Sequence, residues 1–350
     1  MKGKMQAFRI VAPLTMELQE IDIPDLKPYE VLVKVIATGV CTTDVELYDG
    51  SMSYYRDGLS KMPLTAGHEW SGTVAELGSA VKGFEIGDLV VGDISIGCGT
   101  CMNCKKGKYH LCSDRTELGV IRYDGSMAEY LKTDGKNIYK VPAGVTAEQA
   151  ALVEPLATVL YAARRTGIDP GDHVVVFGDG PIGLLNAQLA NCCGAGKVAV
   201  VARKELHRDL IEKKWGMKLI NSNDGDIHEA LKDYFGDYPD VVFEDTGNPE
   251  VINTAARVTA PGGKLCAVSL TGRDTVPFCL EYITSRDITL YGVLASPNSF
   301  APALNMMASG KIDVESCISH RFGFEQTPEA LEFARNSHGQ GRIKILIKKE

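Results

Sequence analysis

Four cysteines lie close together at the spacing C-x2-C-x2-C-x7-C, formed by Cys98, Cys101, Cys104 and Cys112. Four thiolates so close can surround one tetrahedral Zn²⁺ and leave no open position, which is typical of a structural site. An iron–sulfur cluster also uses four cysteines, and a redox pair or free thiols are the plainer alternatives. No second cluster pattern follows this loop, so we expect zinc. The metal and the loop should then order together.

A second group of metal-ligand residue types lies on both sides of this loop. Cys41 comes before it, as does the motif G-H-E-x2-G-x5-G, which contains His68 and Glu69, and Glu154 follows it in E-P-L-A. Singly, a histidine is more often a structural residue and a cysteine a small buried one. Together these residues offer the mixed N, O and S ligands of a catalytic zinc, which keeps one position for water or substrate. Their joint occurrence therefore favours a second, open metal site.

A glycine-rich segment has the pattern G-x-G-x-x-G. Its three glycines are Gly178, Gly180 and Gly183, and Pro181 and Ile182 lie between the last two; we expect all five to contact the cofactor. The pattern alone is weak, because a tight turn without a ligand would also explain it. Here it follows an apolar strand expected at 173–177 and opens a helix expected to run through residue 190. In that setting the glycines let a pyrophosphate approach the helix N-terminus, so we expect a dinucleotide.

The end of the second strand of this unit distinguishes between two dinucleotides. An NAD site expects Asp or Glu about 20 residues after the glycine motif, bonded to the ribose hydroxyls. This chain has Ala202 there, followed by Arg203 and Lys204. An acid would repel a 2′-phosphate, whereas alanine leaves room for it and the two cations can pair with it. We therefore expect NADP(H) to be preferred over NAD(H). The alternative is that both cations only solvate the start of a helix.

These motifs, in this order from about residue 5 to the C-terminus, resemble the zinc-containing medium-chain alcohol and polyol dehydrogenases. Glu154 resembles the sorbitol and threonine dehydrogenase branch, where a Glu replaces the third-ligand Cys of other alcohol dehydrogenases. The segment S-H-R-F at 319–322 also resembles that branch. The resemblance implies hydride transfer between a secondary alcohol and a nicotinamide cofactor. It also implies a catalytic zinc at Cys41, His68 and Glu69, and a homo-oligomer, either a dimer or a tetramer.

The resemblance further assigns residues to proton transfer. Glu154 would bind the catalytic zinc or the water upon it, and Thr43 would take the proton of the substrate hydroxyl. Zinc suits this chemistry because it can lower the pKa of a bound oxygen to about 7 in favourable sites. Glu46 stands where many relatives have a histidine that completes the relay to solvent. A carboxylate can also relay a proton, but its usual pKa is lower than that of histidine.

The expected substrate pocket differs from that of sorbitol dehydrogenases. The polyol branch usually has an Arg-Tyr pair before a shared Asn segment, whereas this chain has A-S-P-N at 295–298. Loss of the pair should widen the pocket and remove hydroxyl-binding donors. We expect a polyol, sugar or cyclitol other than glucitol. An L-threonine 3-dehydrogenase-like enzyme is the alternative, although that relative usually takes NAD. The segment at 54–57 forms either a lid near the zinc or a solvated loop.

Composition narrows the range of partners. The net charge of -8 over 350 residues argues against nucleic acid, because such binders need surplus Lys and Arg. The same charge disfavours a third interpretation, in which the four-cysteine loop is a zinc-ribbon module for nucleic acid. No apolar run is as long as a membrane span, and no signal-peptide pattern opens the chain. We expect a cytoplasmic protein with reduced cysteines and a small-molecule substrate.

Two kinds of segment must position these residues. The first half has short expected strands, among them 31–36, 72–77 and 88–91, separated by Gly and Pro. From about residue 158, apolar strands alternate with helices, which is typical of a parallel sheet built from right-handed βαβ units. The expected strands there are 173–177, 197–201, 240–244 and 264–270, and the expected helices after the glycine motif are 204–214 and 249–258.

The fold class that follows is α/β with two domains, the default for a chain of this length. We expect a GroES-like, mostly β catalytic domain at 1–156 and a doubly wound parallel sheet of the Rossmann type at 157–294. Residues 295–350 should return to the catalytic domain, because 343–347 could form a strand that rejoins it.

Overall fold

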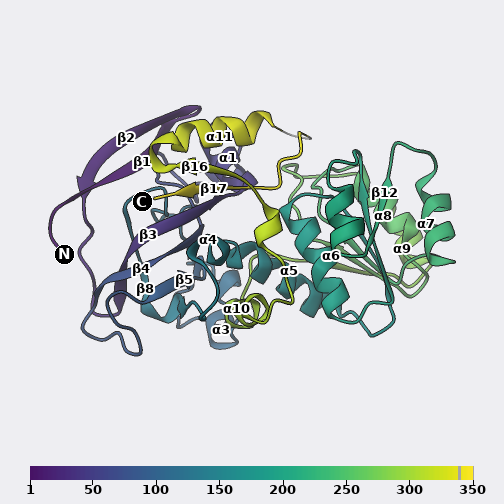
Figure 1. The fold of residues 1–350 in the computed structure, drawn as a ribbon, viewed down its shortest axis with the longest axis horizontal. Coiled ribbons are helices and arrows are strands. Elements are labelled where there is room, and N and C mark those ends of the chain that lie inside the picture. Colours follow the sequence, from purple (N-terminus) through teal and green to yellow (C-terminus); the bar gives the residue numbers. More distant parts are fainter. Residues whose placement is uncertain (338–339, 350) are drawn as a thin grey trace.

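The first sheet is built around one long strand, β3 (Glu30–Val40), in a computed structural model that describes residues 1–337 and 340–349. β3 pairs antiparallel with β4 (Glu69–Leu77), β8 (Tyr130–Asp134) and β17 (Lys344–Lys348). The order of this seven-stranded sheet is β16-β17-β3-β4-β5-β9, with β8 beside β3. Because β17 ends the chain, the C-terminal segment completes a sheet begun by the N-terminal one, as Figure 1 shows. The strand expected to rejoin the first domain is thus confirmed.

Short strands and helices surround this sheet. The remaining strands of this half are β1 (Lys4–Ala12), β2 (Thr15–Asp22), β5 (Leu89–Gly92), β6 (Ser95–Ile96), β7 (Thr116–Glu117), β9 (Ile138–Lys140) and β16 (Ile318–Gly323). Its helices are α1 (Thr42–Asp49), α2 (Ser53–Arg56), α3 (Met102–Lys105), α4 (Ala147–Ala150), α10 (Phe300–Ala308) and α11 (Thr327–Asn336). β1 and β2 form an antiparallel hairpin at the outer edge of the molecule (Figure 1).

The middle of the chain forms a six-stranded parallel sheet in the order β12-β11-β10-β13-β14-β15. Its strands are β10 (His173–Phe177), β11 (Lys197–Ala202), β12 (Lys218–Asn221), β13 (Val241–Glu244), β14 (Lys264–Ala267) and β15 (Thr289–Gly292). Near-continuous Val runs in β10 and β11 suit strands that are buried on both faces. The predicted doubly wound sheet is confirmed. The order reverses between β10 and β13, and ligands of such sheets bind outside the carboxyl ends of the strands at this point.

Five helices accompany the parallel sheet, and one of them links the two halves. They are α5 (Val153–Thr166), α6 (Pro181–Cys192), α7 (Ile227–Phe235), α8 (Val251–Val258) and α9 (Leu280–Thr284). α5 packs against α6 and α10, and one apolar core contains Leu156, Leu184 and Phe300 from these three helices. With 14 residues, α5 is the longest helix in the described ranges, and none of these helices is both long and apolar enough to cross a membrane.

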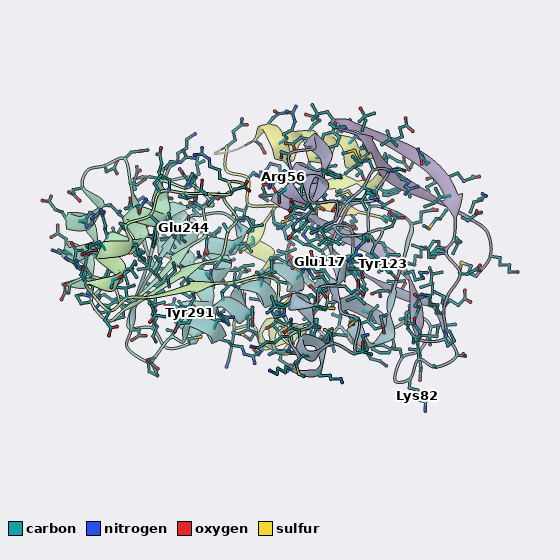
Figure 2. All side chains as sticks on the ribbon, turned by 180° about the vertical axis from the view of Figure 1, so that it is seen from behind. Arg56, Lys82, Glu117, Tyr123, Glu244 and Tyr291 are labelled. Carbon is teal, nitrogen blue, oxygen red and sulfur yellow. The ribbon has the colours of Figure 1, made fainter. Side chains whose placement is uncertain are left out.

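One of the two expected domain boundaries falls inside a helix and the other falls in a connecting segment. The boundary after residue 156 lies within α5, and the boundary after residue 294 lies in the connection between β15 and α10. Figure 2 views the molecule from behind, with Glu117 on the first half and Glu244 and Tyr291 on the parallel-sheet half. The core shared by α5, α6 and α10 joins these halves.

Two expected elements are shorter than the pattern predicted. The charged helix expected at 204–214 is reduced to a π-helical segment, Asp209–Lys214, and the strand expected at 264–270 ends at Ala267. Residues before the π-helical segment form bends and turns, because His207 contacts Asp179 in the glycine motif and Gly341 in the C-terminal segment. These contacts override the helical preference of the charged residues.

Candidate active site

The ends of two paired strands bring the first metal-ligand group together. Gly39, near the end of β3, is paired with Glu69 at the start of β4. Cys41 follows β3 and His68 immediately precedes β4, so this register places both beside Glu69. Gly39 is required here, because a Cβ at this position would lie 2.1 Å from Glu69 Oε2. The antiparallel pairing of β3 and β4 therefore assembles the cluster.

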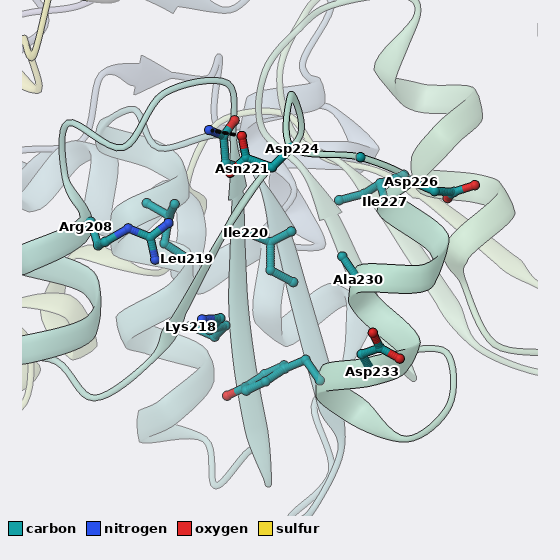
Figure 3. A pocket seen from close by; sticks show the side chains of 12 residues that line it. Arg208, Lys218, Leu219, Ile220, Asn221, Asp224, Asp226, Ile227, Ala230 and Asp233 are labelled. Atoms are coloured by element: carbon teal, nitrogen blue, oxygen red, sulfur yellow. Dashed lines mark hydrogen bonds between the residues drawn. The ribbon is translucent and has the colours of Figure 1, made fainter.

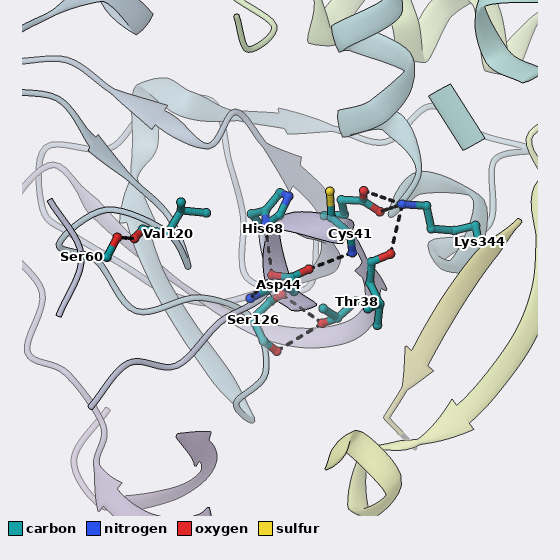
Figure 4. Close-up of polar contacts among 11 residues, drawn as sticks. Thr38, Cys41, Asp44, Ser60, His68, Val120, Ser126 and Lys344 are labelled. Carbon is teal, nitrogen blue, oxygen red and sulfur yellow. Dashed lines mark hydrogen bonds and ion pairs between the residues drawn. The ribbon is translucent and has the colours of Figure 1, made fainter. Parts of the chain in front are cut away.

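The ligand atoms of Cys41, His68 and Glu69 all lie within 4.8 Å of one another. A tetrahedral Zn²⁺ with bonds of 2.0–2.3 Å holds its ligand atoms roughly 3.3–3.8 Å apart, so these three groups fit one ion. His68 and Glu69 are buried and Cys41 is half-buried. Figure 4 shows Cys41 and His68 side by side. The cluster offers a thiolate, an imidazole and a carboxylate, as the sequence predicts.

Asp44 is fully buried and connects the two segments that carry these ligands. Its carboxylate accepts hydrogen bonds from the backbone N–H of Cys41 at 2.9 Å and of Gly67 at 3.0 Å. Its Oδ1 also lies 3.2 Å from His68 Nδ1 (Figure 4). Burial acts to lower the pKa of His68, but Asp44 and Cys41 outweigh it and raise this pKa well above its usual value. A carboxylate behind a metal-binding histidine orients the ring and increases its basicity.

Lys344 at the start of β17 is a buried cation beside Glu69. Its Nζ lies 2.5 Å from Glu69 Oε1 and 2.7 Å from Oε2, and it donates to the carbonyl of Val40 at 3.3 Å. Burial acts to lower the pKa of Lys344, and the Glu69 charge raises it above the usual value. The sequence analysis missed this pair, because the two residues are 275 positions apart.

Glu154 lies in the first turn of α5. It is not one of the three groups whose ligand atoms lie within 4.8 Å of one another. Burial raises the pKa of Glu154 to about 7, with Glu69 adding to the shift and His68 and Lys344 opposing it. The Thr158 hydroxyl donates a hydrogen bond to Glu154 Oε1 at 3.3 Å. A carboxyl group with a pKa near neutrality can exchange a proton at working pH.

The two residues expected to relay a proton lie on α1, directly after Cys41. Thr43 and Glu46 are three positions apart, so they share one face of the helix. Both are half-buried. Burial raises the pKa of Glu46, and Asp49 raises it further. This shift moves Glu46 towards the range in which the histidine of many relatives titrates.

The segment expected to be either a lid or a loop forms α2. Tyr55 Oη donates to the carbonyl of Leu47 at 3.0 Å, which fixes α2 against α1. Arg56 pairs with Asp274 of the parallel-sheet half at 3.1 Å. The segment is therefore tied to both halves of the molecule.

The four cysteines of the second group also converge, since their sulfur atoms all lie within 4.8 Å of one another. Backbone N–H groups point at three of the sulfurs: Cys101 donates to Cys98 at 3.4 Å, Cys104 to Cys101 at 3.5 Å and Cys98 to Cys112 at 3.5 Å. Hydrogen bonds from Thr100 and from the N–H of Cys101 lower the pKa of Cys98 to about 6, whereas burial raises the pKa of Cys104 to about 12. Donors around converging sulfurs stabilise thiolates, so this loop fits a closed zinc site.

The four-cysteine loop contacts the wall of the expected substrate pocket through Tyr109. Its Oη donates to Asp93 Oδ2 at 2.5 Å and accepts a hydrogen bond from the N–H of Asn298 at 2.8 Å. Asn298 Nδ2 also donates to the carbonyl of Gly107 at 3.0 Å. Asp93 is buried, and burial raises its pKa to about 6. The closed loop therefore supports the segment that contains A-S-P-N at 295–298.

The glycine motif lies where β10 turns into α6. Gly178 has a φ of 117°, Gly180 is the N-cap and Pro181 begins the helix. A Cβ at Gly183 would lie 2.0 Å from the carbonyl of Gly178, so only glycine fits there. The N-terminus of α6 thus opens at the switch point of the parallel sheet, where a phosphate can be bound.

Ala202 ends β11, and the exposed Arg203 and Lys204 follow it. Asn223 Nδ2 donates to the carbonyl of Arg203 at 2.5 Å, which joins the loops after β11 and β12. A pocket of about 440 Å³ opens nearby along β12 and α7, with Arg208 in its lining (Figure 3). Arg208 is neutralised by Glu205 at 2.6 Å and Glu212 at 2.7 Å. Arg203 and Lys204 are the two cations that directly follow the end of β11 in the sequence.

His207 joins the glycine motif to the C-terminal segment, a contact that the sequence analysis missed. Its Nδ1 lies 2.9 Å from Asp179 Oδ2 within the motif, and its Nε2 lies 3.4 Å from the carbonyl of Gly341. Burial acts to lower the pKa of His207, but Asp179 outweighs it and raises this pKa. The Asp179 carboxylate therefore has a hydrogen-bonding partner in His207 at the glycine motif.

Two family models match the chain. The alcohol dehydrogenase GroES-like domain matches residues 27–143, and the zinc-binding dehydrogenase domain matches residues 181–309. The first covers the cluster of Cys41, His68 and Glu69 and the four-cysteine loop. The second begins within the glycine motif.

Proteins of known name are similar over nearly the whole chain. A sorbitol dehydrogenase of Bacillus subtilis is 32% identical over 91% of this chain and 90% of its own length. An L-threonine 3-dehydrogenase of Pyrococcus horikoshii is 32% identical over 99% of this chain and 100% of its own length. The solved structure of a zinc-binding dehydrogenase from Sinorhizobium meliloti bound to NADP is 30% identical, with a TM-score of 0.91 and 99% of each chain covered.

Proposed function

The chain belongs to the zinc-containing medium-chain alcohol and polyol dehydrogenase family, and on this premise we propose that it transfers a hydride between NADP(H) and a polyol, sugar or cyclitol. The observation that carries the proposal is the convergence of Cys41, His68 and Glu69 at a site that suits one zinc ion. We assign zinc chemistry to residues 1–156 and 295–350, and the cofactor to residues 157–294.

When bound, the zinc ion supplies the positive charge that favours loss of the alcohol proton, and the nicotinamide ring accepts the hydride. Cys41, His68 and Glu69 hold the metal, and Asp44 orients His68. Thr43 takes the hydroxyl proton, and Glu46 on the same face of α1 passes it towards solvent. Glu154, at the start of α5, would serve either as a further ligand of the metal or as a hydrogen-bond acceptor beside it. In the oxidation direction the carbinol carbon loses a hydride and its oxygen loses a proton, which leaves a ketone.

The preference for NADP(H) is supported by the end of β11. Ala202 has no carboxylate to repel a 2′-phosphate, and Arg203 and Lys204 follow it at the surface. The NADP bound to the relative from Sinorhizobium meliloti is consistent with this assignment.

Replacing Ala202 by Asp is expected to reverse the cofactor preference. The new carboxylate would repel the 2′-phosphate and could bond ribose hydroxyls, so kcat/KM for NADP+ should fall by on the order of 100-fold relative to that for NAD+. Ala202→Ser, which adds no charge, is the matched control and should shift the ratio little. The measurement is kcat/KM with each cofactor. A higher value for NAD+ than for NADP+ in the unmodified enzyme would overturn the preference.

An amino-alcohol dehydrogenase is the second candidate for the substrate class. The relative from Pyrococcus horikoshii is as similar as the sorbitol dehydrogenase and is matched over its whole length. Initial rates with polyols, inositols and L-threonine, each at several concentrations, separate the two candidates. We expect the highest kcat/KM with a polyol or cyclitol.

We also propose that two copies of the chain associate through β15, the edge strand of the parallel sheet. Large apolar side chains are exposed on this strand and on the segment that leads to it from β14: Leu290 on β15 is 47% exposed, Leu270 after β14 is 64% exposed and Leu280 on α9 is 65% exposed. An exposed edge strand can pair with a second copy about a twofold axis, and exposed apolar surface favours burial.

Replacing Leu290 by Lys should therefore convert the assembly into monomers in sedimentation experiments. Leu206, which is 52% exposed in the loop after β11, offers the control. The variant Leu206→Lys should leave the assembly unchanged. An unmodified protein that is monomeric at micromolar concentration would contradict the proposal.

A further inference from the structure

A buried carboxyl group and a buried amide form a pair beneath the glycine motif. Asn186 Nδ2 on α6 donates to Asp245 Oδ2 at 2.7 Å. The second carboxyl oxygen of Asp245, Oδ1, and the amide oxygen of Asn186, Oδ1, are also buried and have no hydrogen-bond partner among the described residues. Both of these oxygens are acceptors while Asp245 is ionised, so neither can satisfy the other. Buried polar atoms without partners are costly, and one added proton would supply the missing donor.

The pair lies at the place where the dinucleotide phosphates are expected. Asp245 follows β13, and its N–H donates to the carbonyl of Phe177 at the end of β10. A Cβ at Gly178 would lie 3.4 Å from the backbone carbonyl of Asp245. Asn186 lies in α6, the helix that the glycine motif opens. A carboxylate charge here would face the pyrophosphate across a poorly solvated space, where like charges repel strongly.

Among the residues that the structure describes, no cation contributes to the pKa of Asp245. Burial raises the pKa of Asp245 to about 8; the Glu244 carboxylate raises it further and the Asn186 hydrogen bond opposes the rise. The Asp245 charge also acts on the Cys266 thiol on β14, which is neutral because burial raises its pKa to about 12, while Thr166 and Arg165 oppose this rise. Asp179, the acid within the glycine motif, has His207 as a partner instead. The two acids near the expected phosphates therefore differ: Asp179 is paired with His207, whereas Asp245 is paired only with a neutral amide.

We propose that Asp245 is protonated in the cofactor-binding enzyme and forms an acid–amide pair with Asn186, in which each group donates one hydrogen bond to the other. Asp245 then acts as a positioning residue: it fixes α6 against the end of β13 and adds no negative charge beside the cofactor phosphates. The inference rests on the nicotinamide dinucleotide of the proposed function. It does not depend on the choice between NAD+ and NADP+, because both contain the pyrophosphate.

The substitution Asp245→Asn tests the pair, because an amide copies the shape and donors of the protonated acid. Dissociation constants of NADP+ and NAD+ are first measured by calorimetry. The pH profile from pH 6 to pH 9.5 is then recorded with the cofactor that binds more tightly. In the unmodified enzyme the affinity should fall above a pH of about 8, by up to about tenfold per pH unit. The Asp245→Asn enzyme should bind within about twofold of the unmodified enzyme at pH 7 and lack this additional fall.

Two control variants separate the pair from general effects. Asn186→Leu removes the amide at similar volume and should weaken binding at pH 7. Asp240→Asn changes an exposed acid at the opposite end of β13 and should leave the pH profile unchanged. His207 and other titrating groups are common to all these enzymes, so only the difference between profiles is used. Identical pH profiles for the unmodified and Asp245→Asn enzymes, or equal loss of binding in Asp245→Asn and Asn186→Leu, would overturn the proposal.

Thermal stability provides a readout without cofactor. The pKa of Asp245 in the folded protein is above its ordinary value of 3.8, so the stabilisation from its protonated form is complete below pH 4 and is lost as the pH rises through about 8. The Tm of Asp245→Asn minus that of the unmodified protein should therefore increase between pH 5 and pH 8. A constant difference would contradict protonation. If Asp245→Asn does not fold, the infrared band of protonated carboxyl groups in the unmodified protein decides: a component should persist at pH 7.5 and disappear by pH 9, above the range in which Asp93 and Glu154 titrate, and the absence of this component overturns the proposal.

Discussion

Replacing Cys41 by Ser, or His68 by Ala, is expected to lower kcat/KM by about 1,000-fold or more. Each change removes one of the three groups whose ligand atoms lie within 4.8 Å of one another. The fold should remain largely intact, because the pairing of β3 with β4 and β17 does not depend on these side chains. Metal analysis should find one zinc per chain in these variants and two in the unmodified enzyme. Turnover and circular dichroism are measured on the same samples.

Cys192→Ser provides a matched control for the loss of a thiol. Cys192 is exposed at the end of α6 and belongs to neither cysteine-containing cluster. This variant should keep two zinc ions and full turnover. Turnover above one tenth of the unmodified rate in Cys41→Ser would show that this thiol is not required for the chemistry.

Replacing Cys101 by Ser is expected to lower the Tm by on the order of 5–10 °C, with no direct effect on the catalytic step. Cys101 is the N-cap of α3, and its sulfur accepts the N–H of Cys104, so the change removes a metal ligand and a helix cap together. The remaining thiolates would lose the cation that offsets their desolvation. Thermal unfolding and zinc content are measured with Cys192→Ser as the control.

The Cys101 variant should lose activity only because the segment at 295–298, which the four-cysteine loop supports, becomes less well ordered. Tyr109 connects the four-cysteine loop to Asp93 and Asn298. The expected pattern is a raised KM for the alcohol with a smaller change in kcat. A Cys101→Ser protein that kept two zinc ions and the unmodified Tm would refute a structural metal site in this loop.

Contiguous motifs made part of the site predictable from the sequence. The four cysteines lie within one loop, and the glycine motif lies in one strand–helix turn, so local spacing fixes most of their geometry. The expected strand at 173–177 matches β10, and the parallel order of the sheet follows from the alternation of strands and helices. The cluster of Cys41, His68 and Glu69 required the resemblance, because only the register of β3 and β4 brings these residues together.

The contacts that the sequence analysis missed join distant segments. Lys344 meets Glu69 through the pairing of β17 with β3, and Asp245 after β13 meets Asn186 on α6. No periodicity or spacing marks such pairs. Asp44 could have been inferred from the sequence, because it lies only three residues after Cys41. At this spacing a carboxylate can accept a hydrogen bond from the N–H of Cys41. The helix expected at 204–214 was wrong for its first turns because tertiary contacts of His207 outweigh local preference.

The most direct test of a zinc- and NADP-dependent dehydrogenase follows the absorbance of reduced nicotinamide in the purified holoenzyme. The enzyme is supplied with NADP+ and a panel of polyols, inositols and amino alcohols, before and after removal of zinc by a chelator. At least one polyol or cyclitol should be oxidised, and this activity should disappear with the zinc and return when Zn²⁺ is added. No absorbance change with any alcohol of the panel while both zinc sites are full, or turnover that survives complete removal of zinc, would contradict the account.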